Sequence, residues 1–129
     1  MIYPKPSIIL LTGIHERKDI SIEERAINFK FGIDEDGQFK CNFINYNYNF
    51  FLKTNVHVED IRIKLKKYEK VRISNYPGFY ICNYLYYYTL FHYKKLCRVL
   101  FVHLPNSGDQ ITCTEILKTI LTTVNIYNE

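Results

Sequence analysis

Ten residues decide how this chain is organised, and they read Ser74-Asn75-Tyr76-Pro77-Gly78-Phe79-Tyr80-Ile81-Cys82-Asn83. The Pro-Gly pair breaks the chain, and apolar residues then recur at helical spacing from Ile81 through Leu85 to Tyr88. The segment therefore predicts a turn that places Cys82 in the first turn of a helix. Unpaired backbone N–H groups and the positive dipole end of such a turn favour a thiolate and can also hold an oxyanion. Cys82 is a candidate nucleophile; the alternative is a small buried apolar residue, as most free cysteines are.

Short apolar runs on either side of this stretch predict the strands of a buried parallel sheet. Val71-Arg72-Ile73 leads into it, and Val99–Val102 follows the helix, with His103 at its carboxyl end. A third run, Ser7–Thr12, is predicted to be a central strand. Ligands of open α/β sheets gather beyond the carboxyl ends of strands. We therefore expect the loop Gly13–Asp19 and His103 to border a site.

Two amphipathic patterns predict the helices that cover this sheet. The first has an apolar face at spacings of three and four residues, with Thr54 or Asn55 as its N-cap: Val58, Ile61, Leu65 and Tyr68. The second begins at a capping box from Thr112 to Glu115 and closes the chain. The helix after Cys82 carries tyrosine or phenylalanine nearly all round, which predicts that it is buried on more than one side.

A further aromatic segment, residues 38–51, alternates asparagine with tyrosine and phenylalanine. This period of two predicts a strand or hairpin whose aromatic side chains pack in the core. Aromatic side chains in a chain of net charge +4 would also suit single-stranded nucleic acid, so a small RNA-binding module is one hypothesis. The charge is mild, and the basic residues form patterns typical of solvated helix faces. We therefore expect no nucleic-acid partner.

Length and composition limit the class of protein. The 129 residues, 47% of them hydrophobic, suffice for one compact domain over residues 1–129 but not for two. The four cysteines contain no CxxC pair, and the first six residues lack the apolar core of a secretory signal. No apolar run approaches the length of a membrane span. We expect a cytoplasmic protein with reduced cysteines and no membrane partner.

The ten-residue stretch resembles the nucleophile segment of pyroglutamyl peptidase I, a family of cysteine (thiol) peptidases. The family pattern reads Ser-Asn-x-Ala-Gly-x-aromatic-aliphatic-Cys-Asn, and Pro77 replaces the alanine. Two further blocks follow the family order: Ile20-Ser21-Ile22-Glu23 with Ala26-Ile27-Asn28, and Phe101-Val102-His103-Leu104-Pro105. The resemblance runs from about residue 7 to the C-terminus. It implies an α/β fold, a three-layer α/β/α sandwich with a mostly parallel central sheet, N-terminally truncated relative to the family.

The resemblance also implies an activity and a site. Family members are hydrolases that remove an N-terminal pyroglutamate from peptides, without a cofactor or a metal. The implied catalytic residues are Cys82, His103 and Glu23. Counting back from Asn28 selects Glu23 as the acid, while Glu24 stays open as the alternative.

The substrate side of the implied site is less regular. Tyr80 corresponds to an aromatic residue that flanks the substrate ring, and Ile81 and Arg17 complete the candidate substrate-binding set. Arg17 matches the arginine of a glycine-rich loop, in which His15 and Glu16 replace glycines. His92 is a competing base, but it lies ten residues along the helix from Cys82, which is about 15 Å at 1.5 Å per residue.

A second hypothesis is a catalytically weak or inactive homologue that acts as a binding or regulatory protein. The family's opening segment has a Gly-Phe-Pro-Phe signature that is unmatched here, and its aromatic residues close the substrate pocket. We therefore expect weak or no hydrolysis by these 129 residues despite the three catalytic residues. A sheet that lacks a strand leaves an edge open for pairing, so we also expect a tendency to form homo-oligomers.

Overall fold

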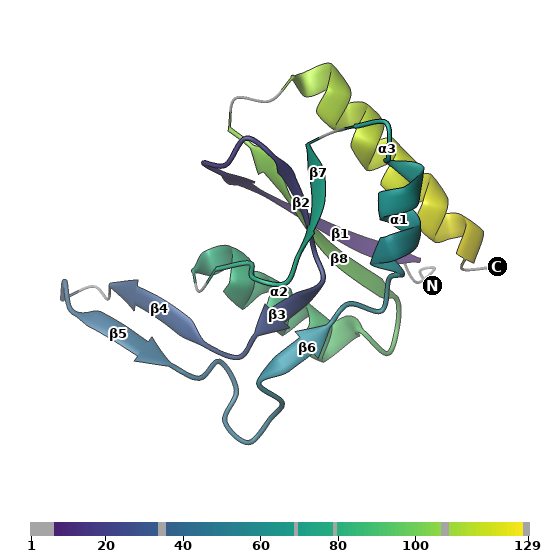
Figure 1. Cartoon of the computed structure of the whole chain (residues 1–129). Coiled ribbons are helices and arrows are strands. Elements are labelled where there is room, and N and C mark those ends of the chain that lie inside the picture. The colour runs from purple at the N-terminus through teal and green to yellow at the C-terminus, as the bar shows by residue number, and fades with distance from the viewer. Residues whose placement is uncertain (1–6, 34–35, 69, 79, 107–108, 128–129) are drawn as a thin grey trace, which may run out of the picture.

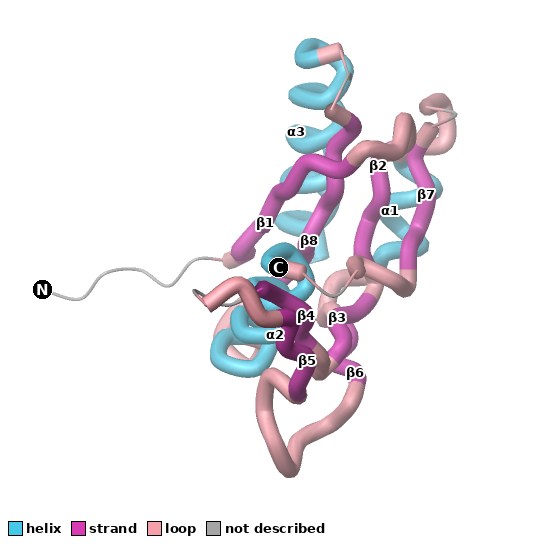
Figure 2. The backbone as a smooth tube through the Cα atoms, turned by 90° about the vertical axis from the view of Figure 1, so that its left-hand side faces the viewer, coloured by secondary structure: helices cyan, strands magenta, loops and turns pink. Residues whose placement is uncertain are grey.

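The computed structural model describes residues 7–33, 36–68, 70–78, 80–106 and 109–127 of the chain. In this described part, a four-stranded sheet has the order β1-β8-β2-β7 (Figure 2). The strands are β1 (Ile8–His15), β2 (Ile20–Glu23), β7 (Val71–Ser74) and β8 (Arg98–Pro105). β1 is parallel to β8 and β2 is parallel to β7, whereas β2 and β8 are antiparallel. The sheet is thus mixed, with mostly parallel pairings.

The prediction that β1 is a central strand is wrong, because β1 lies at an edge of this sheet and β8 lies inside it. Both strands carry continuous apolar runs, and alternate residues of β1 pack against the clusters on both faces of the sheet. Burial on two faces gives the same sequence pattern at an edge as in the centre.

Helices cover both faces of the sheet (Figure 1). On one face lie α1 (Val58–Lys64) and α3 (Gln110–Tyr127), and on the other lies α2 (Ile81–Tyr93). The first face packs Ile22, Leu100 and Val102 against Ile61 and Ile120. The second packs Val99 and Phe101 against Tyr86, Tyr87 and Leu90. This three-layer arrangement confirms the predicted fold class.

Two short antiparallel ribbons extend beyond the sheet next to α2 (Figures 1 and 2). They are β3 (Arg25–Ile27) with β6 (Phe51–Lys53), and β4 (Lys30–Ile33) with β5 (Phe39–Asn42). Asn83 ties α2 to the first ribbon, because its side chain accepts from the Ile27 N–H at 2.8 Å and donates to the Ile27 carbonyl at 2.8 Å and the Phe29 carbonyl at 3.0 Å. Asn28 similarly exchanges hydrogen bonds with the backbone of Asn45.

The expectation that the aromatic segment packs in the core is wrong for most of its side chains. Phe43, Tyr46, Tyr48 and Phe50 are exposed. The helix α2 likewise buries Tyr86 and Tyr87 but exposes the tyrosine or phenylalanine rings at four other positions: Tyr84, Tyr88, Phe91 and Tyr93. An all-round aromatic pattern shows which side chains could be buried, but not whether a second element covers them. No described helix is long and apolar enough to cross a membrane.

The predicted apolar face of α1 is confirmed for Val58, Ile61 and Leu65, but the predicted helix caps are wrong. Thr54 and Asn55 instead bind the chain around β8: the Thr54 hydroxyl donates to the Val99 carbonyl, and the Asn55 amide accepts from the Val99 N–H at 2.9 Å. At α3 the capping side chain is Asp109. It accepts from the Ile111 N–H at 3.1 Å and from the Thr112 hydroxyl at 2.8 Å.

Candidate active site

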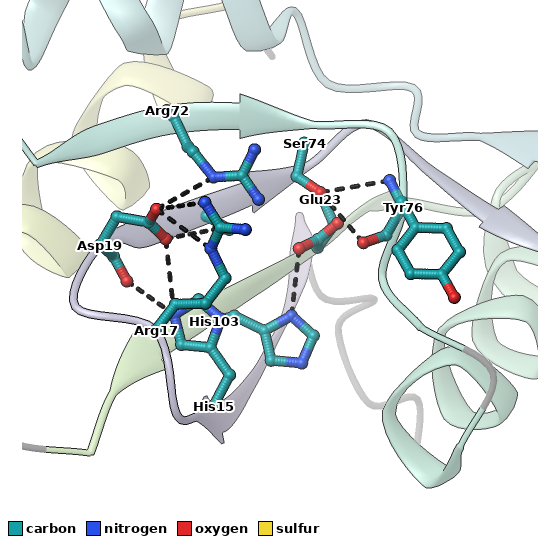
Figure 3. A network of polar contacts seen from close by, with 9 residues as sticks. His15, Arg17, Asp19, Glu23, Arg72, Ser74, Tyr76 and His103 are labelled. Carbon is teal, nitrogen blue, oxygen red and sulfur yellow. Dashed lines mark hydrogen bonds and ion pairs between the residues drawn. The ribbon is translucent and has the colours of Figure 1, made fainter.

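A buried histidine–carboxylate pair lies on the α2 side of the sheet. Alternation along β2 and β8 directs Ile22 and Val102 to the α1/α3 side and leaves Glu23 and His103 for the opposite side. His103 Nδ1 lies 3.1 Å from Glu23 Oε1, and the two side chains are only 8% and 2% exposed (Figure 3). A carboxylate can only accept, so Nδ1–H is the donor. This fixes the tautomer of His103 and leaves its Nε2 available for proton exchange.

The structure brings Glu23, and not Glu24, to His103. Glu24 is half-buried, and its Oε1 lies 3.9 Å from Lys53 Nζ on the neighbouring ribbon. The Glu23 backbone is held by the Tyr86 hydroxyl, which donates to the Glu23 carbonyl at 2.7 Å. Oε2 of Glu23 is buried and has no hydrogen-bond partner among the described residues. Glu23 therefore uses one carboxylate oxygen to orient the histidine.

Cys82 is the second residue of α2, as the Pro-Gly turn predicts, and it is half-buried. A Cβ added at Gly13 would lie 2.8 Å from Cys82 Sγ, so the sulfur lies directly against this glycine. Gly13 of β1 is in turn the register partner of His103 on β8. Adjacent strands are about 4.7–4.9 Å apart. The nucleophile candidate and the histidine thus border the same glycine.

The electrostatics of Cys82 differ from the sequence-based expectation. Burial, and after it the negative charge of Glu23, raise the pKa of the Cys82 thiol above its ordinary value. The start of a helix favours a thiolate, but here a desolvated sulfur lies near a carboxylate. Both effects favour the neutral thiol over the thiolate. Activation of Cys82 needs a base to take the proton, and the candidate is His103, which pairs in register with Gly13.

A cleft of about 450 Å³ opens beside the histidine–carboxylate pair. Its lining includes Glu23, His103 and Arg17, together with Arg72 of β7. The substrate-binding candidates Tyr80 and Ile81 are 70% and 82% exposed at the start of α2 and are not part of this lining. His92 is also exposed, among the rings of Tyr88, Phe91 and Tyr93 on the outer side of α2.

No protein-family model matches the sequence, and no curated protein matches it at a significant level. Solved structures do match. Pyroglutamyl peptidase I from Bacillus amyloliquefaciens superposes with a TM-score of 0.82 and 22% identity, over 96% of this chain and 68% of that one. A mutant pyrrolidone carboxyl peptidase from Pyrococcus furiosus gives 0.82 and 23%, over 96% and 71%. The enzyme from Fervidobacterium islandicum gives 0.76 and 27%, over 95% and 70%.

The chain has the fold of the pyroglutamyl peptidases. The resemblance indicated by the three sequence blocks is therefore confirmed at the level of structure. Within the pyroglutamyl peptidase fold, the cleft of this chain also contains side chains that the sequence blocks did not select: His15 and Arg72, with Asp19 bound to both. The sequence signal for His15 and Asp19 was the loop Gly13–Asp19, in which His15 replaces a glycine, whereas no sequence pattern had indicated Arg72 of β7.

Proposed function

We propose that this protein is a cysteine peptidase that removes N-terminal pyroglutamate from peptides. The observation that carries the proposal is the buried Glu23–His103 pair, with Cys82 at the start of α2 against Gly13, the register partner of His103. Its occurrence on the fold of the pyroglutamyl peptidases supports the same interpretation. The chemistry needs a nucleophile, a base and an orienting acid, and no cofactor or metal.

In this mechanism His103 Nε2 takes the proton of Cys82 as Sγ attacks the pyroglutamyl carbonyl carbon. Because the pKa of the thiol is raised, proton transfer and attack are coupled and no thiolate accumulates beforehand. Backbone N–H groups in the first turn of α2 stabilise the oxyanion. His103 then protonates the leaving amine, the C–N bond breaks, and a thioester to Cys82 remains. Water, deprotonated by His103, hydrolyses the thioester and releases pyroglutamate.

Selectivity would come from the neutral lactam of pyroglutamate. An ordinary N-terminus carries a charged amine, which a partly apolar pocket excludes. Tyr80 and Ile81 would contact the lactam ring from the start of α2, and Arg17 would lie on the polar side of the cleft. We further propose that residues 1–129 act as one domain in the cytoplasm, where the free cysteines stay reduced.

The alternative is a binding or regulatory protein on the same scaffold. It is favoured by the exposure of Tyr80 and Ile81, which no described element covers, and by the raised pKa of Cys82. Such a protein would retain affinity for pyroglutamyl peptides without turning them over.

A fluorogenic pyroglutamyl amide separates these two functions, with the corresponding prolyl amide as the substrate control. The peptidase function predicts hydrolysis of the pyroglutamyl amide only, and its loss in Cys82→Ala and His103→Ala. Cys41→Ala is the matched control, because Cys41 is exposed on β5, away from the site. Hydrolysis that survives Cys82→Ala would contradict the mechanism. Saturable binding of a pyroglutamyl peptide without turnover would establish the alternative.

A further inference from the structure

A second histidine, His15 at the end of β1, lies face to face with His103. The two ring centroids are 5.2 Å apart, and the ring planes differ by 17° (Figure 3). On β8 itself, the Phe101 ring lies 4.7 Å from the His103 ring at a tilt of 45°. The His103 ring therefore has aromatic neighbours from two strands in addition to the hydrogen bond that it donates to Glu23.

Asp19 fixes the position of His15. His15 Nε2 lies 2.6 Å from the Asp19 carbonyl oxygen and 3.7 Å from Asp19 Oδ1. A carbonyl oxygen can only accept, so Nε2–H of His15 is the donor. His103 is protonated on Nδ1 and His15 on Nε2, so the two stacked rings have opposite tautomers, each set by its own oxygen acceptor.

The Asp19 carboxylate is held in turn by neighbouring elements. It accepts from Arg17 at 2.9 Å and from the Ser21 hydroxyl at 3.0 Å, and its Oδ2 pairs with Arg72 Nε at 3.2 Å (Figure 3). Burial opposes ionisation, but the hydrogen bonds from Arg17 and Ser21 and the charge of Arg72 hold the pKa of Asp19 below its ordinary value. The segment from His15 to Asp19 is therefore tied to β2 and β7.

We propose that His15 is a positioning residue for His103. Its ring keeps the His103 ring in the plane in which Nδ1 faces Glu23 and Nε2 can serve Cys82. The consequence for hydrolysis rests on the function proposed above, whereas the ordering of the ring does not.

The first test uses ring resonances of histidine and needs no activity. His15→Phe keeps a ring, His15→Gln keeps a donor for Asp19 without the ring, and His92→Ala removes an exposed histidine elsewhere. We expect a sharp His103 Nδ1–H resonance, identified by its absence in His103→Ala, in the wild type, His15→Phe and His92→Ala. It should be broadened by exchange with water in His15→Gln. An equally sharp resonance in His15→Gln would overturn the proposal.

The second test is hydrolysis of the pyroglutamyl amide. His15→Gln should lower kcat roughly 10- to 100-fold with little change in KM, because a small misplacement of a catalytic group has effects of that order. His15→Phe keeps the stacked ring and should therefore keep most of kcat. An unchanged kcat in His15→Gln, or an effect on KM alone, would reject the proposal. If neither the wild type nor any variant hydrolyses the substrate, the proposed peptidase function is wrong. The His103 Nδ1–H resonance then still tests whether His15 positions the His103 ring.

Discussion

The two faces of the central sheet use the same strands for different purposes. On the α1/α3 side, β2 and β8 present Ile20, Ile22, Leu100 and Val102 to an apolar core. On the α2 side, the alternate residues include Phe101 in the core and the polar pair of Glu23 and His103. The second side also opens into the cleft beside this pair. A period of two along a strand thus lets one residue stabilise the fold while its neighbour serves the site.

The largest effect is expected from a substitution in the polar Glu23–His103 pair that leaves the apolar side of the sheet unchanged. Glu23→Gln should reduce kcat/KM for a pyroglutamyl amide by roughly 10³- to 10⁴-fold, as loss of the orienting acid does in comparable triads. Glu24→Gln is the matched control and should stay within a few-fold, since Glu24 contacts Lys53 instead. A larger loss in Glu24→Gln would show that the assignment of the acid is off by one residue.

The next prediction concerns a substitution in the apolar core on the α1/α3 side that leaves the polar pair unchanged. Ile120 of α3 is fully buried, so Ile120→Ala should lower the free energy of unfolding by about 2–5 kcal/mol. Urea denaturation measures this change. The kcat of the folded variant should stay close to that of the wild type, because α3 does not touch the cleft. A large loss of kcat at full folding would mean that the two faces are coupled.

A third substitution acts at Gly13 of β1, where the core residue Phe101 and Cys82 meet on the α2 side of the sheet. In Gly13→Ala the new Cβ would lie 2.8 Å from Cys82 Sγ and 2.9 Å from Phe101 Cζ, so the thiol or the ring must move. We expect a loss of about 1–3 kcal/mol in stability, as for overpacking in general, and slower hydrolysis. Gly32→Ala is the control, because no atom lies within 4 Å of its added Cβ. Equal behaviour of the two variants would show that Cys82 is not held against β1.

The smallest expected effect is a gain in the alkylation rate of Cys82, whereas the first prediction is a loss of kcat/KM. Glu23 contributes to the raised pKa of Cys82, so Glu23→Gln should lower that pKa and increase the thiolate fraction below it. Iodoacetamide should then label Cys82 a few-fold faster at neutral pH, because the thiolate is the reactive species. Cys97 is the internal control, because burial alone raises its pKa. Unchanged or slower labelling of Cys82 would show that Glu23 does not raise the pKa of this thiol.

Much of the fold could be predicted from the sequence, because turns, strands and amphipathic helices leave local patterns. The Pro-Gly turn predicted Cys82 at a helix start, and the apolar run Val99–Val102 predicted a strand with His103 towards its carboxyl end. Local patterns carry no information about which element covers an aromatic side chain. For this reason Tyr46 and Tyr88 were expected in the core but are exposed.

The site was less predictable for the same reason. His15 and His103 come from strands far apart in sequence, and their stacking depends on the register of β1 with β8. The pKa of Cys82 depends on Glu23, which is likewise distant in the chain, so the sequence indicated the effect of the helix but not the opposing carboxylate. The N-cap prediction for α1 was wrong because the Thr54 and Asn55 side chains form long-range hydrogen bonds with the backbone of Val99 on β8.

The hydrogen bonds between the Asn83 side chain and the backbone of Ile27 affect how the start of α2 moves. Helix ends fray, and the end of α2 that carries Cys82 follows a glycine with φ of 87°. Asn83 is the next residue, and its amide bonds to both backbone groups of Ile27, like a rung of a strand pair. Opening the first turn would break these bonds together, so the fluctuations of Cys82 are set by the ribbon β3–β6. Hydrogen exchange at the Ile27 amide would therefore report how often the segment around Cys82 opens.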